Sequence, residues 1–164
     1  MKFTFDTFIQ LFPEIQLPVS VSEESVHTFS AENDPLPEKL VMEHLLPIEP
    51  EGDDPDDLTE YIACFRLAEV KNFHAIVYWK AGLLNYQYIL ATFEKGGKLI
   101  DRQVIAGTLS DGSSILRSAA RIDTDFTIYI VSGLTEGSEE VYDANLSTTR
   151  ELELLPDGRV MELV

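Results

Sequence analysis

Residues 73–80 read FHAIVYWK and residues 86–93 read YQYILATF, and these two stretches decide the fold. Both are rich in β-branched and aromatic residues, which favour β-strands. In the first stretch, one face carries Val77 and Trp79 whereas the other carries Ile76 and Tyr78. Because both faces are apolar, we expect one to meet helices and the other to close on the curved sheet or to meet a partner.

Six further segments after residue 60 share this composition and a period of two. They are Tyr61–Leu67, Lys98–Ala106, Ile115–Ile122, Phe126–Val131, Glu151–Leu155 and Arg159–Leu163. Turns such as 94–98 and 123–125 are too short for a helical crossover, so successive segments are predicted to be antiparallel neighbours. Between them, Ser132–Arg150 has no period and predicts a long surface excursion.

The first 46 residues carry helical signals instead. A phenylalanine-rich stretch at 5–12 places its apolar residues at helical spacing, and Pro13 ends it. A second helix is expected from an N-cap at Ser22, and a third begins at Pro37. All three are short and amphipathic, which is typical of helices that cover a sheet.

These patterns predict a single α+β domain over residues 1–164, because about 100–200 residues form one domain. We expect short helices in residues 1–46 to cover a mainly antiparallel β-meander in residues 61–164. An acidic loop over residues 47–60 joins the two parts. The meander has seven or eight strands and forms a curved sheet or a partly open barrel.

The chain is strongly acidic, and the acidity is concentrated near its start. Twelve basic residues against 29 acidic ones give a net charge of −17, which argues against nucleic acid as a partner. Residues 49–60 alone hold seven carboxylates, and we interpret them as a solvated segment because the EF-hand spacing of a calcium site is not met. The negative electrostatic field of this segment is expected to attract cationic protein surfaces and to speed their association with the chain. The residues predicted to provide this steering are Asp53, Asp54, Asp56 and Asp57.

Cysteine content and the first residues bear on the cellular compartment. Cys64 is the single cysteine, so an intramolecular disulfide or a cysteine-based metal cluster is excluded, and we interpret it as a core thiol. No apolar run reaches the length of a membrane span. The start, MKFTFDTFIQLFPEIQ, lacks the apolar region and cleavage site of a signal peptide. We therefore expect a cytoplasmic protein.

Motifs of known catalytic chemistry are missing from the sequence. Its serine and glycine clusters lack the G-x-S-x-G spacing, and its glycines do not form a phosphate-binding loop. The sharpest metal hypothesis combines Glu43, His44 and His74, if the third helix packs on the strand at 73–80. A partly buried, hydrogen-bonded His44 on the helix face is the alternative, and no cofactor is expected.

Aromatic side chains are densest in the two stretches that decide the fold. Tyr78, Trp79, Tyr86 and Tyr88 lie on adjacent expected strands. They are candidates for a ligand or partner surface, either as the wall of a cavity or as an interface hot spot. The alternative is that they form the sheet core, because neighbouring strands pair such residues across the sheet.

Phe12–Pro18 follows the pattern F-P-x-I-x-L-P, and strand and turn residues follow at 90–101, 122–130 and 155–160. In these stretches the chain resembles a group of uncharacterised small bacterial proteins. These proteins open with a phenylalanine-rich helix and continue as a β-meander. The resemblance implies no activity and no catalytic residues.

Three functions from different classes follow from these observations. We predict a non-enzymatic soluble binding protein whose partner is a protein with a basic surface, as an inhibitor or immunity-like protein would have. One alternative is a small-molecule binder with an aromatic-lined cavity in the curved sheet, and the other is a metal-dependent enzyme that uses His44 and His74. A cavity on the order of several hundred cubic ångströms beside Trp79 would favour the small-molecule binder.

Overall fold

Helices occupy the N-terminal part of the computed structural model, which describes residues 4–33, 36–49, 59–82, 85–110, 113–136 and 147–163. They are α1 (Phe5–Gln10), α2 (Ser25–Glu32), α3 (Glu38–Leu40), a π-helical turn η1 (Val41–Leu45) and a 3-10 turn η2 (Leu46–Ile48). At the start of α1, the side chain of Thr4 accepts the Thr7 N–H at 3.2 Å. Ser22 does not cap α2 as expected, because the helix starts at Ser25 after a turn closed by the Ser25 N–H on the Ser22 carbonyl.

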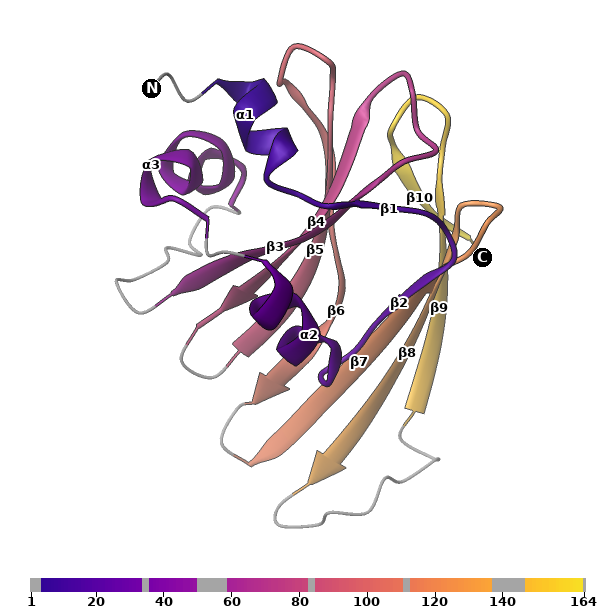
Figure 1. The fold of residues 1–164 in the computed structure, drawn as a ribbon. Helices are drawn as coiled ribbons and strands as arrows, with labels where there is room; N and C mark the ends of the chain where they lie inside the picture. Colours follow the sequence, from indigo (N-terminus) through magenta and orange to yellow (C-terminus); the bar gives the residue numbers. More distant parts are fainter. Residues whose placement is uncertain are drawn as a thin grey trace.

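Ten strands of the described residues form one mainly antiparallel sheet (Figure 1). They are β1 (Glu14–Ile15), β2 (Val19–Val21), β3 (Glu60–Leu67), β4 (His74–Ala81), β5 (Asn85–Phe93), β6 (Leu99–Ser110), β7 (Ser114–Ile122), β8 (Thr127–Glu136), β9 (Ser147–Leu154) and β10 (Val160–Leu163). The order is β1-β3-β4-β5-β6-β7-β8-β9-β10, and β2 pairs with β7. The α+β class and the antiparallel meander are therefore confirmed.

The strand count differs from the expected seven or eight because the N-terminal region adds two strands. β1 pairs in parallel with the end of β3, and β2 pairs antiparallel with the end of β7. These strands have two and three residues, so their partners rather than a local pattern determine them. The expected excursion over Ser132–Arg150 is also too long, because β8 runs to Glu136 and β9 begins at Ser147.

The sheet opens between β6 and β7. β6 pairs with β5 from Leu99 to Leu109, whereas only Gly107–Ser110 also pair with β7. The far end of β7, at Ala120–Ile122, pairs with β2 instead of β6. As a result the two halves of the sheet separate at one end and enclose a concave face, which α2 and β2 cross (Figure 1).

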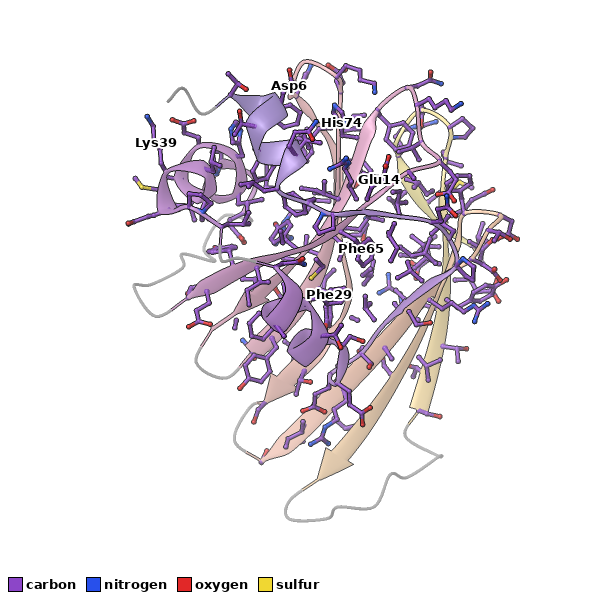
Figure 2. The ribbon with its side chains drawn as sticks, in the orientation of Figure 1. Asp6, Glu14, Phe29, Lys39, Phe65 and His74 are labelled. Atoms are coloured by element: carbon purple, nitrogen blue, oxygen red, sulfur yellow. The ribbon has the colours of Figure 1, made fainter. Side chains whose placement is uncertain are left out.

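Two separate cores fill the two faces of β3, β4 and β5. On the outer face, α1, α3 and η1 bury an apolar cluster that includes Phe8, Leu40 and Tyr78. On the concave face, a second cluster includes Val77, Tyr88 and residues from β6 to β9. Phe29 of α2 joins this concave core, with its ring 5.8 Å from that of Phe65 (Figure 2). The expected division of apolar residues between two faces is confirmed.

Four connections lie at one end of the sheet, which we call the turn end: residues 68–73, 94–98, 123–126 and 155–159. The turn between β9 and β10 folds over the concave face there. Buried Thr92 donates its hydroxyl to the Gly158 carbonyl at 2.6 Å, and Asp101 accepts the Val160 N–H at 2.8 Å. The turn end of the concave face is thereby joined to β5 and β6.

Candidate functional site

The four aromatic residues singled out from the sequence do not form one surface. Tyr78 lies fully buried in the outer core, whereas Tyr88 lies buried in the concave core and donates its hydroxyl to the Ser22 carbonyl at 2.8 Å. Burial raises the pKa of both phenols. Both residues thus serve the cores, and only Trp79 and Tyr86 remain for a surface.

Trp79 and Tyr86 stack on each other on the concave face, opposite the turn end. Their ring centroids are 5.7 Å apart and the rings are inclined by 14°. Trp79 is partly buried against the concave core, while Tyr86 is 40% exposed. An aromatic pair of this kind presents a flat, rigid apolar wall to solvent.

A groove of about 330 Å³ lies against this wall, and we call it the Tyr86 groove. Its lining comes from five strands: Tyr86 and Gln87 of β5, Val104, Ile105, Ala106, Gly107 and Leu109 of β6, Leu116 and Ser118 of β7, Ile130 and Ser132 of β8, and Thr148 and Arg150 of β9. Side chains alternate along a strand, so Leu116, Ser118 and Ser132 share the concave face with the buried residues Ala120 and Ile130. The groove is therefore the uncovered end of the concave face.

Polar groups lie in the same groove at the β7–β9 side. The hydroxyls of Ser118 and Ser132 hydrogen-bond at 2.8 Å across the pair β7–β8. Arg150 donates its Nε to Glu162 at 2.6 Å, and both side chains are about half exposed. An apolar floor with a few convergent polar groups is the usual composition of a small-molecule site.

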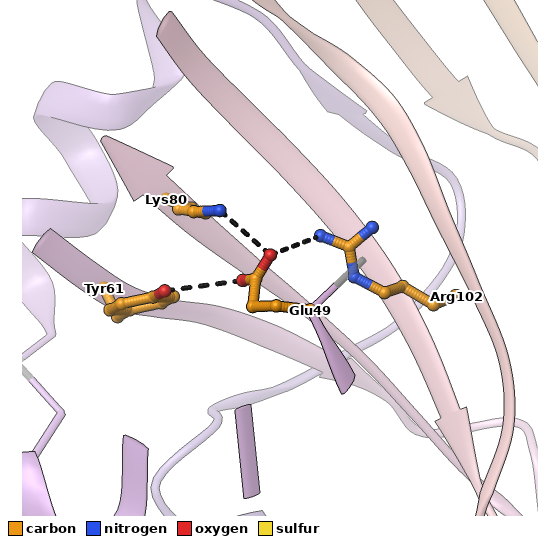
Figure 3. A network of polar contacts seen from close by, with 4 residues as sticks. All are labelled: Glu49, Tyr61, Lys80 and Arg102. Atoms are coloured by element: carbon orange, nitrogen blue, oxygen red, sulfur yellow. Dashed lines mark hydrogen bonds and ion pairs between the residues drawn. The ribbon is translucent and has the colours of Figure 1, made fainter. Parts of the chain in front are cut away.

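A second polar arrangement lies on the outer face, where Glu49 follows η2 (Figure 3). Its Oε2 accepts hydrogen bonds from Lys80 Nζ at 2.9 Å and Arg102 Nη2 at 3.2 Å, and its Oε1 accepts from the Tyr61 hydroxyl at 3.4 Å. The Glu49 side chain is only 5% exposed. The prediction that the whole acidic stretch is solvated is wrong at Glu49, because these cations bury it.

Two polar atoms beside this network have no hydrogen-bond partner among the described residues. They are the Tyr78 hydroxyl and Nε of Arg102, and both are buried. Burial raises the pKa of Tyr78, and the nearby Arg102 opposes that rise. This network is compact and covered by side chains, so we interpret it as the contact that fixes the chain after η2 on the sheet.

The metal hypothesis is not supported by the geometry of its residues. His44 packs with its ring 4.8 Å from Phe8 and 5.5 Å from Phe5, and His74 lies 5.7 Å from Phe5. Within the described ranges, no group of three His, Cys, Asp or Glu residues is placed to hold a metal ion. Burial lowers the pKa of both histidines, so both are neutral aromatic packing residues near neutral pH.

Other residues named from the sequence fall outside any shared site. Cys64 is buried, and burial raises its pKa, as expected for a core thiol. Asp53, Asp54, Asp56 and Asp57 lie outside the described residues, so electrostatic steering stays a prediction. No helix of the described chain is long and apolar enough to cross a membrane.

Comparisons with known proteins add no functional information. No protein-family model matches the chain, and neither the curated proteins nor the solved structures contain a match. The Tyr86 groove is therefore judged on its own geometry.

Sequence reasoning identified one wall of this groove and missed the other. Tyr86 stood out because it belongs to the densest group of aromatic residues in the sequence. Ser118, Ser132 and Thr148 are small polar residues, which are common in any solvent-facing strand. The signal available was positional: they continue the alternation of buried apolar residues on β7, β8 and β9.

Proposed function

We propose that the protein binds a small molecule in the Tyr86 groove and acts without catalysis. The observation that carries this proposal is the groove of about 330 Å³ beside the stacked Trp79 and Tyr86 pair. Its size falls in the range of about 300–1,000 Å³ typical of ligand sites. This favours the small-molecule binder over the basic protein partner predicted first, for which the described residues offer no comparable surface feature.

The composition of the groove favours a ligand with a flat ring and hydroxyl or amide groups. Tyr86 offers an exposed ring for stacking, and Leu109 and Leu116 extend the apolar surface. Ser118, Ser132 and Thr148 offer hydroxyls for hydrogen bonds. The net charge of −17 repels anions, so a neutral or cationic ligand fits better than an anionic one.

The test uses 2-naphthol, a flat ring with one hydroxyl, as the probe. Trp79 is the only tryptophan and stacks on Tyr86, which lines the groove, so its fluorescence reports a ligand that contacts Tyr86. We expect saturable quenching in the wild type, and Tyr86→Ala should weaken binding by about tenfold or more, as loss of an aromatic anchor does.

Tyr129→Ala is the matched control. Tyr129 is 38% exposed, close to the 40% of Tyr86, but it lies between the inward-facing Ile128 and Ile130 and so points to the opposite face. Its removal should leave the affinity for 2-naphthol unchanged. Equal affinities of the two variants, or quenching that does not saturate, would refute the groove as the site.

A further inference from the structure

Three turns at the turn end share one hydrogen-bond pattern. In each, the first residue donates its N–H to the carbonyl of the fifth, and the fourth donates back to the first. The turns are Glu94–Lys98, Asp123–Thr127 and Leu155–Arg159. The fourth position has a positive φ in every case: 105° at Gly97, 66° at Phe126 and 94° at Gly158.

Phe126 is therefore the exception among three equivalent positions. Glycine adopts positive φ freely, whereas a residue with a Cβ rarely does, and a bulky aromatic there is unusual. Two glycines are needed because a Cβ at Gly97 would meet the Phe5 ring at 3.1 Å and one at Gly158 would meet Ile100 at 2.7 Å. At Phe126 the backbone adopts the same conformation and still carries a large side chain.

The ring of Phe126 forms part of the wall of a cavity of about 380 Å³ at the turn end. The other walls come from the connection between β3 and β4, from the end of β9 and from the turn between β9 and β10. They are Glu69, Val70, Lys71, Asn72, Phe73, Leu154, Leu155 and Pro156. Three separate connections thus converge on one apolar space, at the opposite end of the concave core from the Tyr86 groove.

We propose that this turn-end cavity is a second binding site, for an uncharged apolar molecule of one or two rings. Its walls are mainly apolar, with Phe73 buried and Phe126 partly buried. Of its charged residues, Glu69 already accepts the Leu17 N–H at 3.1 Å, and Lys71 is exposed at the rim. A charged ligand would lose hydration without gaining a buried partner, so a neutral one is favoured.

The unfavourable backbone of Phe126 supports this assignment independently of the cavity. Residues with an unfavourable backbone conformation persist only when the surrounding structure holds them in it. They are often found at ligand-binding sites. A turn with glycine at this position would fold with less strain, as the two sister turns show. We therefore assign the Phe126 side chain to the wall of the turn-end cavity that the apolar molecule contacts.

The test measures binding of N-phenyl-1-naphthylamine, a neutral probe whose fluorescence rises in apolar surroundings. Val70→Trp fills the cavity from the β3–β4 connection, and Val131→Trp is its control on an exposed valine of β8. We expect the wild type and Val131→Trp to bind alike and Val70→Trp to lose the signal. Phe126→Gly should weaken the probe by about tenfold or more, because it removes a wall of the cavity while glycine keeps the turn conformation.

Each remaining outcome decides against the site. No saturable binding by the wild type, or binding that survives both Val70→Trp and Phe126→Gly, would overturn it. If Tyr86→Ala removed the signal and Val70→Trp did not, the probe would occupy the Tyr86 groove instead. Because the two sites have separate variants, failure here leaves the proposed function of the Tyr86 groove standing, and the reverse also holds.

Discussion

The outer and concave faces of the sheet differ in how they are covered. On the outer face, three helical segments from the first 48 residues bury β3, β4 and β5, and Glu49 fixes the end of this cover. On the concave face, α2 and β2 cover only part of the sheet (Figure 1), and a cavity lies at each end. The comparison shows that helices cover one side of the sheet, while the strand ends leave open cavities on the other.

Phe8→Ala is expected to have the largest effect, because it attacks the outer core. Phe8 is fully buried and lies 5.2 Å from Phe12 and 4.8 Å from His44, ring to ring. We expect the free energy of unfolding to fall by about 3–5 kcal/mol. Denaturant unfolding measures this, with Met42→Ala, which is 58% exposed, as the control. A loss near that of Met42→Ala would contradict a solid outer core.

Glu49→Gln tests the polar end of the same cover. It removes the charge that accepts hydrogen bonds from Lys80 and Arg102 in a buried setting, so unfolding should become easier by about 2 kcal/mol or more. Glu162→Gln makes the same change at the half-exposed pair with Arg150 and should cost less than about 1 kcal/mol. If chemical denaturation gave equal losses, burial of the Glu49 network would not matter.

Thr92→Val tests closure of the concave face at the turn end. Valine has nearly the same shape as threonine but no hydroxyl. The Gly158 carbonyl therefore loses the hydrogen bond that it accepts from Thr92 at 2.6 Å. We expect a loss of about 1–2 kcal/mol in the free energy of unfolding, and weaker binding of N-phenyl-1-naphthylamine nearby. Thr124→Val, at an exposed turn position, is the control. Unchanged stability in Thr92→Val would show that the turn is held by other contacts.

The smallest effect concerns pH and again separates the faces. Burial lowers the pKa of His44 and His74 on the outer face, although Glu43 opposes this at His44. Below the unfolded value of about 6.5, the unfolded chain binds more protons than the native one, so stability falls as pH decreases from about 7.5 to 5.5.

A variant with His44→Phe and His74→Phe should show a flatter decline. The measurement is urea unfolding across this pH range, with both proteins in the same buffers. Affinity of the Tyr86 groove for 2-naphthol should not change over the range, since these histidines lie on the outer face. An identical slope in both proteins would contradict the role of the two histidines.

Prediction from the sequence succeeded where a pattern is local. All eight expected strands exist, and the faces of β4 and β5 are as expected, because alternation is visible within each segment. The sequence did not distinguish Glu49 from the other acidic residues of 49–60 or indicate that it would be buried. Its burial depends on hydrogen bonds from Lys80 and Arg102, which lie on strands far along the chain. The Tyr86 groove likewise depends on how five strands curve together.

The pairing of β1 and β2 has a consequence for synthesis of the chain. Both strands are complete by residue 21, yet β1 needs Arg66 and Leu67, and β2 needs residues 120–122. At roughly 5–20 residues per second, the ribosome delivers the β2 partner several seconds after β2 itself. During that interval β2 has no partner strand for its backbone hydrogen bonds, so its native pairing forms only late in synthesis.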